Sequence, residues 1–177
     1  NSYFNSIETI ATNMKDELYN VRNGSTKIEV FLSKFGHLRP GTFDINSLSY
    51  DEDPKQYFDF NYNDSSGHKS DKHFSFSEDE NLRMENLMNK IGLSIDNKRL
   101  FRFIENSVKG REHSKFVFSR SVSDSLKILI KWAKNNGFSR EDLSFVDFDF
   151  LVKKASNIRT KSDLNFIREH ILEHKQK

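Results

Sequence analysis

The chain has 177 residues, of which 35% are hydrophobic and 31% charged, and its formal net charge is only +2. This length suits one domain, or at most two small ones, with a real core, and 17 phenylalanines supply much of the apolar area that a core needs. The near-neutral charge lacks the strong basic field of a nucleic-acid-binding protein, and no apolar run approaches the roughly 20 residues that cross a bilayer. Because there is no cysteine, disulfides and thiolate catalysis are excluded, and we expect a protein of the reducing cytoplasm.

Two helices are predicted before residue 36. Apolar side chains spaced three and four residues apart predict the first, which ends near Gly24. A capping box of Thr26 with Glu29 predicts the start of the second, which ends at Gly36. The side chains expected on the buried faces are Ile7, Ile10, Ala11, Met14, Leu18, Val21, Ile28, Leu32 and Phe35.

Residues 36–76 show no sustained helical or strand period. A segment of this length without periodicity is usually functional or disordered. We expect a long irregular loop, ordered over its aromatic-rich first part and mobile over its polar second part, which contains His68 and His73. A loosely bound metal at these two histidines is the less favoured interpretation of the polar part.

Helical periodicity resumes at Ser77. Capping boxes predict three helix starts, at Ser77 with Glu80, Ser139 with Asp142, and Thr160 with Asp163. Residues 97–137 are expected to be helical with a break near Ser121. The helix after Ser77 is expected to bury a stripe of Met84, Leu87, Met88 and Ile91. Only residues 145–150, "FVDFDF", alternate as a strand does, and so short a run favours a helix or its flank. The predicted fold is therefore one all-α domain over residues 1–177 with an irregular loop at about 36–76.

The stretch "FGHLRPGTFDI" carries the sharpest candidate site. Pro40 and Gly41 predict a turn in which proline fixes one φ angle and glycine frees the next. His37 and Arg39 place a titratable imidazole and a permanent cation on this turn, and Asp44 follows to orient either of them. Charge on a rigid turn is what a substrate-positioning loop requires. The alternative interpretation is that Arg39 and Asp44 only pin the loop to the helices.

A second candidate lies in "KGREHSKFVFSR". Arg111 and Lys115 are four residues apart and share a helix face, where two cations can hold a phosphate or carboxylate. Phe116 and Phe118 indicate that this segment is partly buried. The alternative is an ordinary solvated face with an ion pair between Glu112 and Lys115.

The stretch "HILEH", His170 to His174, matches the H-x-x-E-H pattern of inverted zinc metalloproteases. Only three residues follow His174 in this sequence, which leaves little room for a downstream ligand. We therefore favour a solvated helix with histidines near its negative end, and we expect no metal site.

The segment "FLSKFGHLRPGTFDINSLSYDEDPKQYF" resembles one found in phosphoenolpyruvate-utilising phosphotransferases, which include phosphoenolpyruvate synthase, pyruvate phosphate dikinase and rifampicin phosphotransferase. The matching positions are Gly36, His37, Arg39, Gly41, Asp44, Tyr50, Asp53 and Pro54. The stretches "REHSKFVFSRSVSDSLKIL" and "GFSREDLSFVDF" also look like the downstream helical part of these proteins.

The resemblance implies a parent enzyme with an ATP-grasp module, a helical substrate-side domain and a swivelling phospho-His domain. The chain would be a fragment comprising the helical domain, inactive alone, with no catalytic residue or cofactor of its own; the parent would use ATP and Mg. Its expected partners are the other two domains and a small-molecule acceptor, with neither nucleic acid nor membrane.

In this parent, His37 would act in acid–base chemistry or position phosphate, with Asp44 orienting His37 or Arg39. Arg39, Arg111 and Lys115 would neutralise the charge of the transferred phosphoryl group. The alternative is a non-enzymatic helical binding or scaffold module that uses loop 36–76 as its contact surface.

Overall fold

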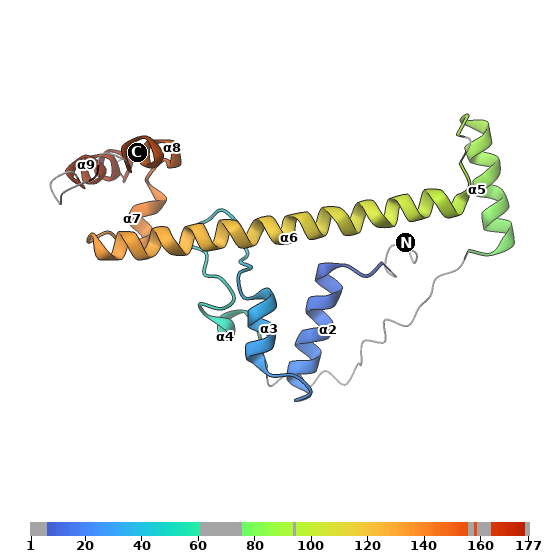
Figure 1. Cartoon of the computed structure of the whole chain (residues 1–177), viewed down its shortest axis with the longest axis horizontal. Helices are drawn as coiled ribbons and strands as arrows, with labels where there is room; N and C mark the ends of the chain where they lie inside the picture. The colour runs from blue at the N-terminus through green and yellow to red at the C-terminus, as the bar shows by residue number, and fades with distance from the viewer. Residues whose placement is uncertain (1–6, 61–75, 94, 156–157, 159–163, 176–177) are drawn as a thin grey trace. The chain divides into compact units, whose positions relative to one another are not determined.

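The computed structural model describes residues 7–60, 76–93, 95–155, 158 and 164–175. Every regular element in these residues is a helix, so the predicted all-α class is confirmed (Figure 1). The helices are α2 (Ile10–Arg22), α3 (Ile28–Phe35), α4 (Pro54–Tyr57), α5 (Glu78–Lys90), α6 (Asn97–Asn135), α7 (Arg140–Ser144), α8 (Phe148–Ala155) and α9 (Asn165–Lys175). None of these described helices is both long and apolar enough to pass through a bilayer.

The chain separates into two compact units. The first comprises Asn1–Phe31 with Asp59–Val117, and the second comprises Leu32–Phe58 with Phe118–Lys177. Helix α6 supplies residues to both units. The single-domain organisation expected from the sequence stays a prediction.

Helix α6 is unbroken over 39 residues, so the predicted break near Ser121 is wrong. The serine-rich stretch stays helical, and within it the hydroxyl of Ser125 donates a hydrogen bond to the Ser121 carbonyl, at 2.9 Å. A hydroxyl that bonds back onto the preceding turn satisfies itself within the helix. The serines near position 121 therefore do not interrupt the helix.

Capping boxes correctly predict two of the helix starts. The capping box of Ser77 with Glu80 is present at α5, and that of Ser139 with Asp142 is present at α7. The start of α3 differs from prediction, because the Val30 amide donates to the carbonyl of Lys27 at 3.1 Å, whereas a helix capped by Thr26 would have it donate to the Thr26 carbonyl. The predicted box of Thr160 with Asp163, like His68 and His73, lies outside the described residues.

Three glycines follow helices with left-handed backbone angles. Gly24, Gly92 and Gly137 have φ of 78°, 76° and 77°, and they follow α2, α5 and α6. Glycine adopts this conformation without the steric cost of a Cβ atom, which is why it so often ends helices.

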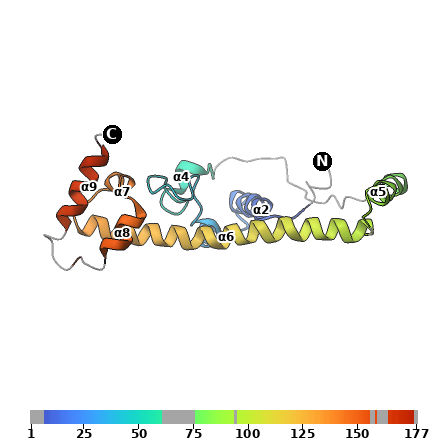
Figure 2. The same ribbon diagram turned by 90° about the horizontal axis from the view of Figure 1, so that it is seen from above.

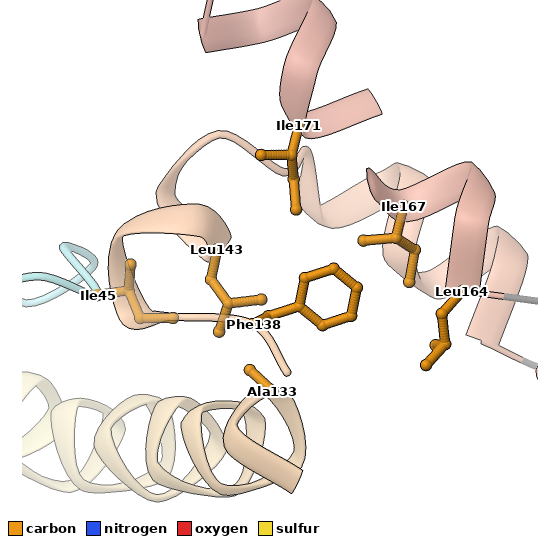
Figure 3. Packing of buried hydrophobic residues seen from close by; sticks show 7 residues of the cluster. All are labelled: Ile45, Ala133, Phe138, Leu143, Leu164, Ile167 and Ile171. Carbon is orange, nitrogen blue, oxygen red and sulfur yellow. The ribbon is translucent and has the colours of Figure 1, made fainter. Parts of the chain in front are cut away.

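The core of the second unit lies at the C-terminal end of α6. Both ribbon views place α7, α8 and α9 around this end (Figures 1 and 2). Figure 3 shows how the buried side chains converge, and these are Ile45, Ala133, Phe138, Leu143, Leu164, Ile167 and Ile171. Ile45 comes from the stretch between α3 and α4, so this stretch is part of the core rather than a surface connection.

The first unit buries less of its predicted apolar face. On α5 only Met88 is buried, whereas Leu87 and Ile91 are 60% and 69% exposed. The prediction that both side chains are buried is therefore wrong. The link from α5 to α6 is polar, because the side-chain amide of Asn97 donates to the Asn81 carbonyl at 2.9 Å.

Candidate functional site

The chain from residue 36 to residue 58, here called the α3–α4 segment, is closed at its base by backbone hydrogen bonds. The Tyr50 amide donates to the Leu38 carbonyl at 2.8 Å, and the Asp51 amide donates to the Gly36 carbonyl at 3.0 Å. A Cβ atom on Gly36 would lie 2.4 Å from the Leu32 carbonyl oxygen and 2.8 Å from the Asp51 Cβ. Glycine is needed at position 36 because a Cβ atom would collide with the last turn of α3 and with Asp51.

The turn around Pro40 and Gly41 is tight, but not for the predicted reason. Gly41 is absent from the described glycines with positive φ, so the interpretation that it frees this angle is wrong. It supplies space instead, because a Cβ there would lie 2.8 Å from the Cβ of Asp44. The Gly41 amide donates to the hydroxyl of Ser47 at 3.2 Å, and Asp44 Oδ1 accepts from the Asn46 amide at 2.9 Å.

Arg39 is buried inside the segment, with only 2% of its side chain exposed. Its Nη1 donates to the Ser47 carbonyl at 3.0 Å, and its Nη2 donates to Ser123 Oγ on α6 at 2.9 Å. Burial lowers the pKa of Arg39, and the nearby carboxylate of Glu52, 3.9 Å away, opposes this effect. The predicted partner Asp44 is exposed and caps its own turn, so Glu52 rather than Asp44 faces this cation.

Ser49 connects the two acidic side chains of the segment. Its hydroxyl, fully buried, lies 2.6 Å from Asp51 Oδ1 and 2.8 Å from Glu52 Oε2. Each carboxylate also meets a cation from outside the segment. Lys127 on α6 lies 2.5 Å from Asp51, and Arg140 on α7 binds Glu52.

These contacts keep both carboxylates ionised. Partial burial alone would raise the pKa of Asp51 and of Glu52. Hydrogen bonds from Lys127 and Ser49 to Asp51, and from Ser49 and Arg140 to Glu52, outweigh burial and lower both pKa values. Charges of both signs therefore compensate one another within the second unit.

Helix α4 completes the segment. Asp53 caps it by accepting a hydrogen bond from the Gln56 amide at 3.3 Å, and Pro54 occupies the first helical turn, where its missing N–H costs nothing. The hydroxyl of Tyr57 donates back to the Leu48 carbonyl at 2.9 Å. This short helix was missed because its four residues show no periodicity, although the Asp-Pro pair is a recognisable start signal.

His37 is also buried, with 5% of its surface exposed. A general acid or base must come within hydrogen-bond reach of its substrate. Because both side chains are buried, neither His37 nor Arg39 presents its polar atoms to a substrate molecule in solution. The structure therefore brings the two residues into one unit, but as interior groups.

Arg111 and Lys115 are exposed side chains of α6 in the first unit. Phe116 is partly buried as expected, whereas Phe118 is 56% exposed, so the expected burial is wrong for Phe118. Since His37, Arg39 and Asp44 belong to the second unit, the anion clamp of Arg111 with Lys115 stays a separate prediction.

The residues of "HILEH" lie together on α9. Ligand atoms of His170, Glu173 and His174 are all within 4.8 Å of one another. The His170 ring stacks on Phe150, with centroids 4.0 Å apart and planes 11° apart, and lies 4.1 Å from the His174 ring. The predicted solvated face is thus wrong for His170, which is partly buried.

The sequence did not single out Ser49, Glu52 or Ser123. Ser123 and Glu52 face the buried cation Arg39, and Ser49 contacts both Asp51 and Glu52. A serine in a helix and a glutamate in an acidic run carry no local signal of the residues that they contact. Comparison with protein-family models, with curated proteins and with solved structures gave no match for this chain.

Proposed function

We propose that this chain is a non-catalytic helical binding module in which the α3–α4 segment presents a protein-binding surface. The observation that supports this most is the burial of Arg39, whose guanidinium donates to Ser47 and Ser123 inside the fold. Together with buried His37, it gives the segment a rigid interior instead of a set of reactive groups at its surface.

The proposed contact surface is an exposed aromatic pair. Phe43 and Phe118 are 73% and 56% exposed, and their ring centroids lie 6.1 Å apart. Aromatic side chains are enriched at the centres of protein interfaces, where they fill pockets of the partner. A rigid segment reduces the conformational entropy lost on binding. The partner expected from this chemistry is a protein with an apolar pocket that receives both rings.

Affinity capture with the purified chain tests this proposal. The baits are the natural chain, a Phe43→Ser/Phe118→Ser double variant, and a Phe148→Ser control at an equally exposed position on α8. The proposal requires a protein that the natural chain and the control retain and the double variant loses. Equal retention by all three baits would exclude the aromatic pair as the contact surface.

A second candidate is the helical middle domain of a phosphoenolpyruvate-utilising phosphotransferase in the cytoplasm. It is favoured by the resemblance of residues 31–58 to that family. The ATP-grasp and phospho-His domains would lie elsewhere in the parent and would hold ATP and Mg. Buried His37 and Arg39 would support the acceptor side of the enzyme, while exposed Arg111 and Lys115 would meet the phosphoryl group or an anionic acceptor.

Phosphotransfer by the parent protein tests the second candidate. An Arg111→Met/Lys115→Met variant should lower transfer to the acceptor while leaving the fold intact, because both side chains are exposed. The isolated chain should transfer no phosphate from ATP. Transfer by the isolated chain, or a parent reading frame without the other two domains, would contradict this candidate.

A further inference from the structure

We propose that His170, Glu173 and His174 form a binding site for one divalent transition-metal ion, of which Zn²⁺ is the first candidate. The three positions share one face of α9, and their ligand atoms lie within 4.8 Å of one another. Zn²⁺ binds nitrogen and oxygen ligands at about 2.0–2.2 Å, so two atoms on one ion are at most about 4.4 Å apart. Tetrahedral binding needs the ligand atoms closer together still, and the exposed carboxylate of Glu173 can rotate towards the two rings.

His174 is prepared to act as a ligand. Its Nδ1 lies 2.8 Å from the carbonyl oxygen of His170. A carbonyl oxygen only accepts hydrogen bonds, so Nδ1 must carry the proton. In the neutral ring this leaves the lone pair on Nε2, and a backbone carbonyl on one ring nitrogen is the usual way in which proteins orient a metal-binding histidine.

The His170 ring is fixed by stacking, and one of its nitrogens lacks a hydrogen-bond partner among the described residues. Stacking on Phe150 at 4.0 Å fixes the plane of the ring. Its Nε2 is buried and has no hydrogen-bond partner among the described residues. An imidazole nitrogen that has lost water without gaining a partner is costly to keep, and a bond to a metal ion would recover that cost.

The surroundings favour a cation at this place. The site occupies the C-terminal part of α9, where the helix dipole is negative, and Glu173 adds a carboxylate. The neighbouring cation Lys175 is 2.7 Å from Asp142, which binds it away from the site. Two imidazoles with one carboxylate suit Zn²⁺ and its transition-metal neighbours better than Mg²⁺ or Ca²⁺, and three protein ligands leave a position for water or a further ligand.

Calorimetric titration of chelator-treated full chain with Zn²⁺ tests the proposal. The natural chain should bind one ion, and Glu173→Gln or His174→Gln should weaken binding tenfold or more, since even outer-shell changes cost about 10–100-fold. These changes at exposed or partly exposed positions leave the buried residues of α9 in place. In NMR spectra, the ring signals of His170 and His174 should leave their metal-free positions when the ion binds.

Two controls decide where the ion sits. His113→Gln alters an exposed histidine of α6, and a His68→Gln/His73→Gln variant removes the histidines of the polar segment. Both should bind Zn²⁺ as the natural chain does. The proposal is overturned if Zn²⁺ does not bind, if Glu173→Gln and His174→Gln leave affinity unchanged, or if the His68/His73 variant is the one that loses it.

Discussion

Arg39 and Ser123 are 84 positions apart in the sequence, and they meet inside the second unit, where Arg39 Nη2 donates to Ser123 Oγ at 2.9 Å. This hydrogen bond joins the α3–α4 segment to the middle of α6. Lys127 and Arg140 bind the acidic residues of the same segment. These three polar contacts therefore join the segment to α6 and α7.

Removing the buried cation should destabilise the second unit. Arg39→Met deletes the bonds to the partly buried Ser47 carbonyl and the buried Ser123 hydroxyl, which should lower the free energy of unfolding by about 2–3 kcal/mol. Urea unfolding followed by fluorescence of Trp132, the single tryptophan, reports on this unit. Lys131→Met, an exposed change on α6, should stay within about 0.5 kcal/mol of the natural chain. Equal stability of the two variants would show that Arg39 has no anchoring role.

Gly36→Ala should be poorly tolerated. The new Cβ would meet the Leu32 carbonyl oxygen at 2.4 Å, so backbone must shift, and we expect a loss of at least about 2 kcal/mol. Gly110→Ala is the matched control, because no atom lies within 4 Å of its Cβ position. Alanine is favoured over glycine in a helix interior by about 1 kcal/mol, so this control should be neutral or stabilising. Far-UV circular dichroism during urea unfolding compares the two variants.

Within the α3–α4 segment, two neighbouring apolar positions should respond differently. Ile45 is 7% exposed and packs in the core, so Ile45→Ala should cost about 2–5 kcal/mol. Phe43 is 73% exposed, so Phe43→Ser should change stability by less than about 0.5 kcal/mol. The Trp132 unfolding assay measures both. A large loss for Phe43→Ser would mean that its ring serves the fold and not a partner.

Acid should weaken the contact between α7 and α9. Hydrogen bonds from Lys175 and Ser139 lower the pKa of Asp142 from 3.8 to about 2. A lowered folded-state pKa stabilises the fold above the unfolded value, so this contribution is full above 3.8 and is lost as pH falls towards about 2.

Urea midpoints measured across this pH range should therefore fall for the natural chain and fall less for Asp142→Asn. The variant should keep some slope, because the pKa values of Asp51 and Glu52 are lowered too. Asp124→Asn changes an exposed carboxylate and should follow the natural curve. If Asp142→Asn followed that curve as well, the Asp142 contacts would not contribute in solution.

The sequence predicted what is decided locally. Ser77 with Glu80 marks the start of α5 because both side chains bond to amides of the same turn. The pairing of Arg39 with Ser123 could not be predicted, since nothing near either residue specifies a partner 84 positions away. Leu87 and Ile91 show a related limit, because periodicity identifies the apolar face of a helix but not whether another element covers it.

The candidate sites also combine features that the sequence indicates with features that depend on distant residues. The sequence singled out the turn near Pro40 and Arg39 as a ligand-binding candidate, whereas the structure buries Arg39 as an internal anchor. Conversely, the H-x-x-E-H stretch was interpreted as a solvated helix end, whereas the structure brings ligand atoms of His170, Glu173 and His174 within 4.8 Å of one another. Stacking on Phe150, which distinguishes His170 from a solvated histidine, depends on another helix and required the structure.

The closed base of the α3–α4 segment has a consequence for hydrogen exchange and proteolysis. The amides of Tyr50 and Asp51 lie outside every described helix, yet they are bonded to the carbonyls of Leu38 and Gly36. Exchange at these amides requires the base to separate, so deuterium should enter them as slowly as it enters the core of the second unit. A protease that cuts mobile loops should likewise spare the segment until that unit opens.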